Sequence, residues 1–188
     1  MTFELGTKVV VYGPSGSGKT TVGRAIAEAL AIPLIELDAI YHCRPGWDDL
    51  STGEFRDAVS RLLAEHAGGW VIDGNYTPVR DLILPEAESI VWLRLPFRVV
   101  YPRLVRRTLR RAVRRELLWG TNRERWRDVL GRESMLVWGI ANWRAHQRRT
   151  REALATVPHS ARAHELRSTW EVRELLRALP SPRDVAGG

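Results

Sequence analysis

The chain has 188 residues, a length that suits one domain with a single sizeable core. Its content of 44% hydrophobic and 27% charged residues is typical of a globular protein, and no apolar run reaches the roughly eighteen residues that span a bilayer. A single cysteine excludes an internal disulfide, the N-terminus lacks the features of a secretory signal, and we therefore expect a cytoplasmic protein.

Short apolar runs in the first half of the chain predict four buried strands. They lie at 8–12, 33–37, 69–73 and 89–95. The valines of the first run show no polar alternation, as in a parallel sheet covered on both faces. A helix follows the glycine-rich turn after this strand. Another begins at Ser51, which forms a capping box with Glu54, and ends near Gly68.

The region 97–157 is predicted to be helical and basic, and to form an insertion before the last strand. Pro102 removes one backbone donor, so we expect a kink or a late helix start there. Alternating strands and helices over this length predict one domain, 1–180, built on a parallel sheet with right-handed crossovers and helices on both faces. The fold class is therefore a three-layer α/β/α protein, with a frayed tail at 181–188.

The end of the chain returns to the pattern of the first half. A last strand is predicted at 161–167, and Ser168 with Glu171 caps a closing helix. We expect its apolar face to consist of Trp170, Leu175, Leu176 and Leu179.

The segment Gly13–Thr20, GPSGSGKT, matches the phosphate-loop pattern G-x-x-x-x-G-K-[ST] between a predicted strand and a helix. Glycines let backbone N–H groups converge on phosphates, and the helix adds the positive end of its dipole. Lys19 is expected to reach the β- and γ-phosphates, and Thr20 to ligate Mg²⁺. The predicted nucleotide-binding residues are Gly13, Ser15, Gly16, Ser17, Gly18, Lys19, Thr20 and Thr21. We expect the ligand to be ATP with Mg²⁺, because the guanine-specific Asn-Lys-x-Asp motif is absent.

Two aspartates follow neighbouring predicted strands and so face the crevice in which open parallel sheets bind ligands. Asp73 is positioned to hold Mg²⁺, unless it only initiates the turn that follows. Asp38 is positioned to bind a second substrate or to accept a proton from its hydroxyl, unless it is a turn or cap residue. His42 and Cys43 have no metal-ligand partners at suitable spacing and are interpreted as loop residues.

The net charge of +7 is concentrated in one segment, 98–151, which holds sixteen arginines and four acidic residues. Such a segment indicates a polyanionic ligand or, alternatively, a solvated helical face. Tryptophans interleave with these arginines, which would suit a nucleic acid, but we favour helix packing for them. Trp70 and Trp92 are expected in core strands, and Trp170 against the core.

Five segments together resemble the bacterial topology modulation proteins, which are similar to adenylate and shikimate kinases. The segments are GPSGSGKT, LDAIYHCRPGW, WVIDGNY with Arg80 downstream, IVWLRLP before an arginine-rich helix, and ELLWGTNRERW. The resemblance implies a five-stranded parallel P-loop fold of the nucleoside monophosphate kinase type. It also implies an acceptor region between the second and third strands and a basic lid after the fourth.

The resemblance carries over to single residues. Asp38, Asn75 and Arg80 are expected to face the acceptor. Arg103 and Arg107 fall at the spacing of lid arginines that neutralise the transferring phosphate, although several neighbours compete for this assignment. These competitors are arginines 106, 110, 111, 114 and 115. Many relatives carry an acid where this chain has Arg94, and the lid lacks the paired cysteines of a zinc site.

The leading hypothesis is a Mg²⁺-dependent kinase that transfers the γ-phosphoryl group of ATP to a small acceptor. A nucleoside monophosphate is the first candidate acceptor and a small hydroxylated metabolite the second. Its predicted catalytic residues are Lys19, Asp73, Asp38, Arg103 and Arg107. The alternative is an ATP-dependent regulator that binds nucleic acid through the arginine-rich helices. A third hypothesis is that the same helices bind a partner protein.

Overall fold

The computed structural model describes residues 3–114, 117–118, 122–123, 143–155 and 161–180. Its centre is a five-stranded sheet with the order β2-β3-β1-β4-β7, in which each neighbouring pair is parallel. The strands are β1 (Lys8–Tyr12), β2 (Leu34–Glu36), β3 (Trp70–Asp73), β4 (Ser89–Leu93) and β7 (Arg162–Leu166). This arrangement confirms the predicted fold class.

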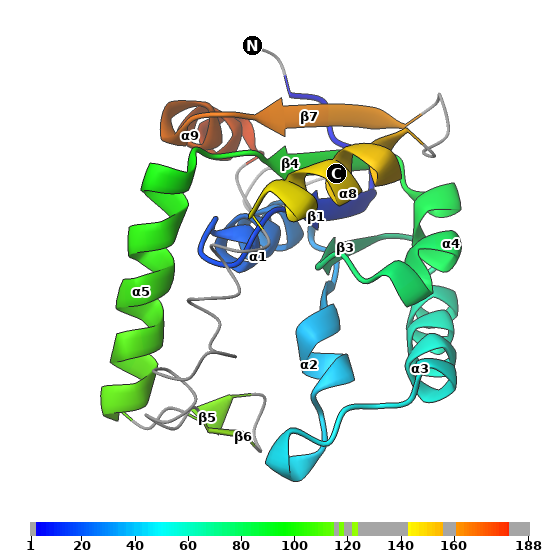
Figure 1. Ribbon diagram of the computed structural model, residues 1–188. Coiled ribbons are helices and arrows are strands. Elements are labelled where there is room, and N and C mark those ends of the chain that lie inside the picture. Colours follow the sequence, from blue (N-terminus) through cyan, green and yellow to red (C-terminus); the bar gives the residue numbers. More distant parts are fainter. Residues whose placement is uncertain (1–2, 115–116, 119–121, 124–142, 156–160, 181–188) are drawn as a thin grey trace.

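Helices fill the connections between these strands, and a last helix follows β7 (Figure 1). They are α1 (Lys19–Leu30), α2 (Leu37–Tyr41), α3 (Thr52–Glu65), α4 (Arg80–Ile83), α5 (Phe97–Arg114), α8 (Trp143–Leu154) and α9 (Thr169–Ala178). Single 3₁₀ turns lie at Pro45–Trp47, Thr77–Val79 and Leu84–Glu86. A small antiparallel pair, β5 (Leu117–Leu118) and β6 (Asn122–Arg123), was not predicted.

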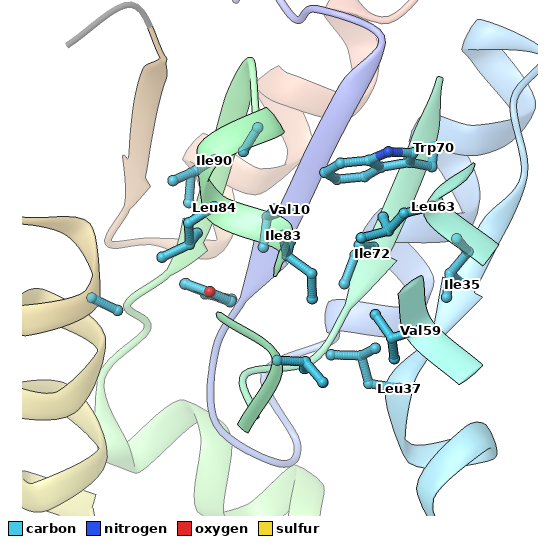
Figure 2. Close-up of a cluster of buried hydrophobic side chains, with 14 of the residues drawn as sticks. Val10, Ile35, Leu37, Val59, Leu63, Trp70, Ile72, Ile83, Leu84 and Ile90 are labelled. Atoms are coloured by element: carbon cyan, nitrogen blue, oxygen red, sulfur yellow. The ribbon is translucent and has the colours of Figure 1, made fainter. Parts of the chain in front are cut away.

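The two faces of the sheet bury different sets of side chains, because neighbouring residues of a strand point to opposite faces. Val10 and Tyr12 face one layer, in which residues of α3, α4 and α8 pack against the strands. Figure 2 shows this layer around the buried ring of Trp70, with Leu63 of α3 and Ile83 of α4 among the side chains that fill it.

On the opposite face Val9 and Val11 pack against α1 and α9. Ile26 of α1 and Leu175 of α9 are both fully buried there. The sheet is thus the middle of three layers, and the carboxyl ends of its strands are left for the connecting loops.

Local capping signals were predicted correctly. Ser51 and Glu54 form the reciprocal hydrogen bonds of a capping box before α3, and Ser168 and Glu171 form the same motif before α9. The predicted apolar face of α9 was wrong at Trp170, whose surface is 59% exposed. Leu175, in the second half of this helix, makes the contact with the core, whereas Trp170 in the first turn points to solvent.

Two segment boundaries differ from the prediction and matter for the site. β2 ends at Glu36 and the chain turns at once into α2, so Asp38 lies in the first turn of a helix and not at the end of the strand, where it was predicted. α5 begins at Phe97 and includes Pro102 in its second turn, so the late helix start was wrong.

Arg94, the departure from the family pattern, follows the last residue of β4. Its guanidinium bonds the Glu165 carboxylate of β7 at 2.7 Å and lies 5.4 Å from the ring centre of Trp92. Arg94 therefore joins β4 and β7 at their carboxyl ends.

α5 approaches the phosphate loop closely at Gly16. A Cβ atom on Gly16 would lie 2.8 Å from the Val100 carbonyl oxygen and 3.0 Å from the Leu104 amide nitrogen. Because only a hydrogen occupies this place, the first helix of the basic region packs with its backbone against the loop.

This packing predicts unequal roles for two leucines of α5. Leu104 is 2% exposed beside Gly16, whereas Leu109 is 40% exposed. We expect Leu104→Ala to lower the free energy of unfolding by about 2–5 kcal/mol, and Leu109→Ala to change it by less than about 0.5 kcal/mol. Urea denaturation followed by tryptophan fluorescence measures both. Equal losses would contradict the docking of α5 on the loop.

Candidate active site

The phosphate loop joins the carboxyl end of β1 to the start of α1. Gly16 and Gly18 have φ values of +88° and +97°, in the left-handed region that favours glycine. The first turn of α1 holds no acidic residue, so its positive dipole end is not neutralised by the chain. This geometry suits a phosphate group.

The remaining predicted loop residues occupy distinct places. Ser17 is buried, and its N–H donates to the Pro14 carbonyl at 3.1 Å, which closes the turn. Gly13 lies against Ser17, where a Cβ would be 2.6 Å from the Ser17 hydroxyl oxygen. Ser15 is half-buried and Thr21 is exposed.

Asp73, at the end of β3, lies beside the first turn of α1. The Thr20 hydroxyl donates a hydrogen bond to one Asp73 carboxylate oxygen at 2.5 Å. Asp73 is only 6% exposed, and its second oxygen, Oδ1, has no hydrogen-bond partner among the described residues. The carboxylate is thus directed to the phosphate loop and does not only start a turn.

Four predicted site residues act on the charge of Asp73. Burial raises the pKa of its carboxyl, and the charge of Asp38 raises it further, while Lys19, the Thr20 hydroxyl and Arg107 lower it. These residues come from α1, α2 and α5, far apart in sequence. The structure therefore brings together five of the residues that the sequence singled out.

Gly74 lets α2 approach β3. Its φ is +134°, and a Cβ atom there would lie 3.0 Å from the Cβ of Leu37. Leu37 opens α2, so this contact places the first turn of α2, and with it Asp38, at the end of β3. Asp38 is exposed, and one of its carboxylate oxygens accepts a hydrogen bond from the Tyr76 hydroxyl at 2.7 Å.

Glu36 is a member of the site that sequence reasoning missed. It pairs in register with Asp73 across β2 and β3, and an ion pair at 3.7 Å links it to Arg24. Burial, and then the charges of Asp73 and Asp38, raise the pKa of Glu36. The signal was available, because Glu36 precedes Asp38 by two residues at the end of the same predicted strand.

Arg80 is held by neutral groups. Its Nε donates to the Asn75 side-chain oxygen at 2.9 Å, and its guanidinium is hydrogen-bonded to the buried Tyr12 hydroxyl. Asn75 in turn donates to the hydroxyl of Thr150 on α8 at 3.3 Å. Within the part of the chain that is described, no carboxylate pairs with Arg80. Both polar ends of the Asn75 side chain are used inside the protein, so Asn75 orients Arg80.

The arginines of α5 fall into two groups. Arg107 and Arg111 are half-buried on the side of the helix that faces the protein, and Arg107 acts on the charge of Asp73. The others are exposed, namely Arg98, Arg103, Arg106, Arg110 and Arg114. Arg103 and Arg107 are thus not equivalent, although both were predicted as lid residues.

Part of the basic region lies outside the described residues, including Arg115, Trp119, Trp126 and Trp138. Trp143, at the start of α8, is half-buried with its ring centre 5.2 Å from that of Phe97. This edge-to-face contact joins α8 to α5, which agrees with the interpretation of Trp143 as a packing residue.

Magnesium suits the oxygen donors at this place. The Thr20 hydroxyl and the buried, unpartnered Asp73 Oδ1 are hard oxygen ligands, the type that Mg²⁺ prefers together with phosphate and water. No group of three or more His, Cys, Asp or Glu side chains that could hold a metal occurs among the described residues. The same residues include no helix long and apolar enough to cross a membrane.

Comparisons with known proteins agree with this geometry. A family model described as an AAA domain matches residues 9–125. A shikimate kinase from Mycobacterium bovis is 31% identical over 167 residues, which cover 82% of this chain and 92% of that protein. A shikimate kinase from Nitratidesulfovibrio vulgaris is 33% identical over 115 residues, or 53% of this chain and 63% of that protein, so this match spans less than two thirds of it.

A solved structure shows the same fold. The shikimate kinase of Bacteroides thetaiotaomicron superposes with a TM-score of 0.50 at 18% sequence identity, covering 91% of this chain and 94% of that one. At this identity the likeness concerns the fold alone.

The raised pKa of Asp73 predicts that its ionised carboxylate lowers the stability of the fold at neutral pH. The folded protein holds a proton on this carboxyl more tightly than the unfolded chain does, so the stability associated with the protonated form is lost as pH rises through the folded pKa. At pH 7 the charged form therefore destabilises the fold. We expect Asp73→Asn to raise Tm at pH 7, by an amount that shrinks as pH falls toward the ordinary value of 3.8.

Thermal unfolding at pH 7 and pH 5 measures this effect. Asp57→Asn is the matched control, because Asp57 is exposed on α3 and its replacement should move Tm by no more than about 2 °C. A lower Tm for Asp73→Asn at pH 7 would show that the favourable contacts of the carboxylate outweigh its burial.

Proposed function

The chain belongs to the P-loop kinase family and is a phosphotransferase, and we propose that it transfers the γ-phosphoryl group of MgATP to a small hydroxylated acceptor bearing one anionic group. The observation that carries the proposal is the meeting of Lys19, Thr20 and Arg107 around Asp73. A transferring phosphoryl group carries negative charge, which cations and a bound metal ion stabilise. Lys19 and Arg107 are two such cations, and Thr20 and Asp73 form a metal-ligand pair at the start of α1. Within this family we assign the chain to the topology modulation proteins, because it carries the motifs GPSGSGKT and WVIDGNY.

On the donor side, the loop and the α1 N-terminus bind the ATP phosphates and Lys19 contacts the β- and γ-phosphates. Thr20 and Asp73 hold Mg²⁺, which neutralises phosphate charge when bound. Arg107 stabilises the transferred group, since it faces Asp73 while Arg103 one turn earlier is exposed. Arg103 is exposed, so its effect on the phosphate charge is weaker than that of Arg107.

On the acceptor side, a carboxylate favours an alcohol over a phosphate as the attacking group. Asp38 lies within the field of Asp73, and its partner Tyr76 directly follows Asn75, the partner of Arg80, in the loop after β3. A hydroxyl must lose a proton as it attacks, which Asp38 can accept. A nucleoside monophosphate attacks with an ionised oxygen that needs no base and is repelled by Asp38. The hydroxylated metabolite therefore becomes the first candidate and the monophosphate the second.

Arg80 supports an anionic substituent on that acceptor. A half-buried guanidinium with two neutral hydrogen-bond partners keeps its charge available, and its planar fork matches a carboxylate or phosphate. Asp38 and Arg80 together suit a hydroxy acid. The relatives are named shikimate kinases, so shikimate is the first acceptor to test.

The function is tested by a coupled assay for ADP with a panel of hydroxy acids, sugars and nucleoside monophosphates, shikimate included. We expect ADP only when an acceptor is present, and a loss of at least about 100-fold in Lys19→Ala. Lys8→Ala is the control, because Lys8, the only other lysine, lies at the start of β1 and pairs with Glu86 at 2.7 Å. It should retain activity within about twofold. No acceptor-dependent ADP across the panel would contradict the proposal.

The assignment of Arg107 is tested by comparison along α5. We expect Arg107→Ala to lower kcat by about 100-fold with a smaller change in the KM for ATP. Arg106→Ala, an exposed neighbour, is the control and should change kcat by less than about twofold. A larger loss in Arg103→Ala than in Arg107→Ala would reverse the assignment of the two lid arginines.

A further inference from the structure

Tyr76 ends the WVIDGNY segment and has no role of its own in the proposed chemistry. Its hydroxyl donates a hydrogen bond to Asp38 Oδ1 at 2.7 Å. Asp38 is exposed in the first turn of α2, where an aspartate side chain otherwise samples several rotamers. The hydrogen bond from a fixed donor therefore determines where its carboxylate lies.

The donor is fixed by aromatic packing. The Tyr76 ring lies 5.2 Å from that of Tyr41 and 5.3 Å from that of Phe55, measured between ring centres, and Tyr41 and Phe55 contact each other at 5.1 Å. Phe55 is fully buried in the core. The three rings form a closed triangle, so the position of the Tyr76 hydroxyl is set by the core of the domain.

The protonation state of Tyr76 suits a permanent donor. Burial, followed by the charge of Asp38 and the hydrogen bond to it, raises the pKa of the phenol well above its usual value. The hydroxyl therefore keeps its proton at neutral pH. Tyr76 therefore donates to Asp38 and does not compete for the proton of an acceptor.

The hydrogen bond from Tyr76 also holds Asp38 against repulsion by neighbouring carboxylates. Asp38 raises the pKa of both Asp73 and Glu36, so the three carboxylates repel one another across the ends of β2 and β3. A mobile Asp38 would be free either to swing into solvent or to approach a cation bound beside Asp73. The hydrogen bond from Tyr76 keeps it on the acceptor side.

We propose that Tyr76 is a positioning residue that fixes the Asp38 carboxylate through Oδ1 and leaves Oδ2 for the hydroxyl of the acceptor. The inference rests on the proposed function. In the step it serves, the acceptor oxygen forms a bond to the γ-phosphorus as its proton passes to Asp38 Oδ2. The bond between the γ-phosphorus and the bridging oxygen breaks, and ADP leaves with that electron pair. Asp38 afterwards releases the proton to water.

The test removes one oxygen atom. Tyr76→Phe keeps the ring and its packing, and we expect kcat with the acceptor found in the panel to fall about tenfold while the KM for ATP stays within twofold. Tyr41→Phe is the matched control, since its ring belongs to the same triangle and no hydrogen bond from its hydroxyl to Asp38 is recorded among the described residues. It should retain full activity. Equal losses in both variants would overturn the proposal.

A double-mutant cycle distinguishes positioning from a general structural role. If Tyr76 acts through Asp38, then Tyr76→Phe in an Asp38→Asn background lowers kcat no further. If the phenol only supports the fold, the two losses multiply, and that outcome overturns the proposal. Tm of each variant, expected within about 2 °C of the parent, excludes loss of folding as the cause.

A measurement without turnover separates this inference from the proposed function. In protein labelled with ¹³C at the tyrosine Cζ, the Tyr76 signal, identified by its absence in Tyr76→Phe, should shift in Asp38→Asn while that of Tyr41 stays in place. No shift overturns the positioning role even where kinase activity is found. A shift without any acceptor-dependent ADP shows that the contact exists and that the proposed function has failed, and the role falls with it.

Discussion

Asp73 carries a buried carboxylate at the point where four segments of the chain meet, and the layout of the site follows from what that charge requires. Burial disfavours the ionised form, and the neighbouring Asp38 adds to the cost. The compensating groups are one hydroxyl donor and two cations, supplied by α1 and α5. Both helices must therefore approach the end of β3 for the charge to be tolerated, and the same convergence prepares the site for phosphate.

The position of α5 depends on a missing side chain. Gly16 lets the backbone of α5 come within 3.0 Å of where a Cβ would stand, and the buried residues of the helix recur every fourth position from Val100 to Ala112. Arg103 and Arg107 each precede a residue of this stripe and are four residues apart, so they lie on the same face of the helix. Position along the helix axis, and not the helix face, therefore distinguishes the half-buried Arg107 from the exposed Arg103.

Features with a local physical cause could be predicted from the sequence. The phosphate loop, both capping boxes and the buried β1 depend on residues within a few positions of each other. The short helix at Asp38 and the exposure of Trp170 depend on surfaces contributed from elsewhere in the chain. Arg94 was predicted only as a departure, because its partner Glu165 is 71 residues away. Long-range pairing of this kind leaves no periodic signal in one sequence.

The loop that leaves β3 connects the two halves of the site. Asp73 faces the phosphate loop, Asn75 holds Arg80, and Tyr76 holds Asp38, all within four consecutive residues. Consecutive Cα atoms are about 3.8 Å apart, so the groups for the donor and for the acceptor are fixed relative to one another by the backbone itself. Because transfer requires the attacking oxygen within about 3–3.5 Å of phosphorus, a short connection between the two halves helps to hold donor and acceptor at that distance.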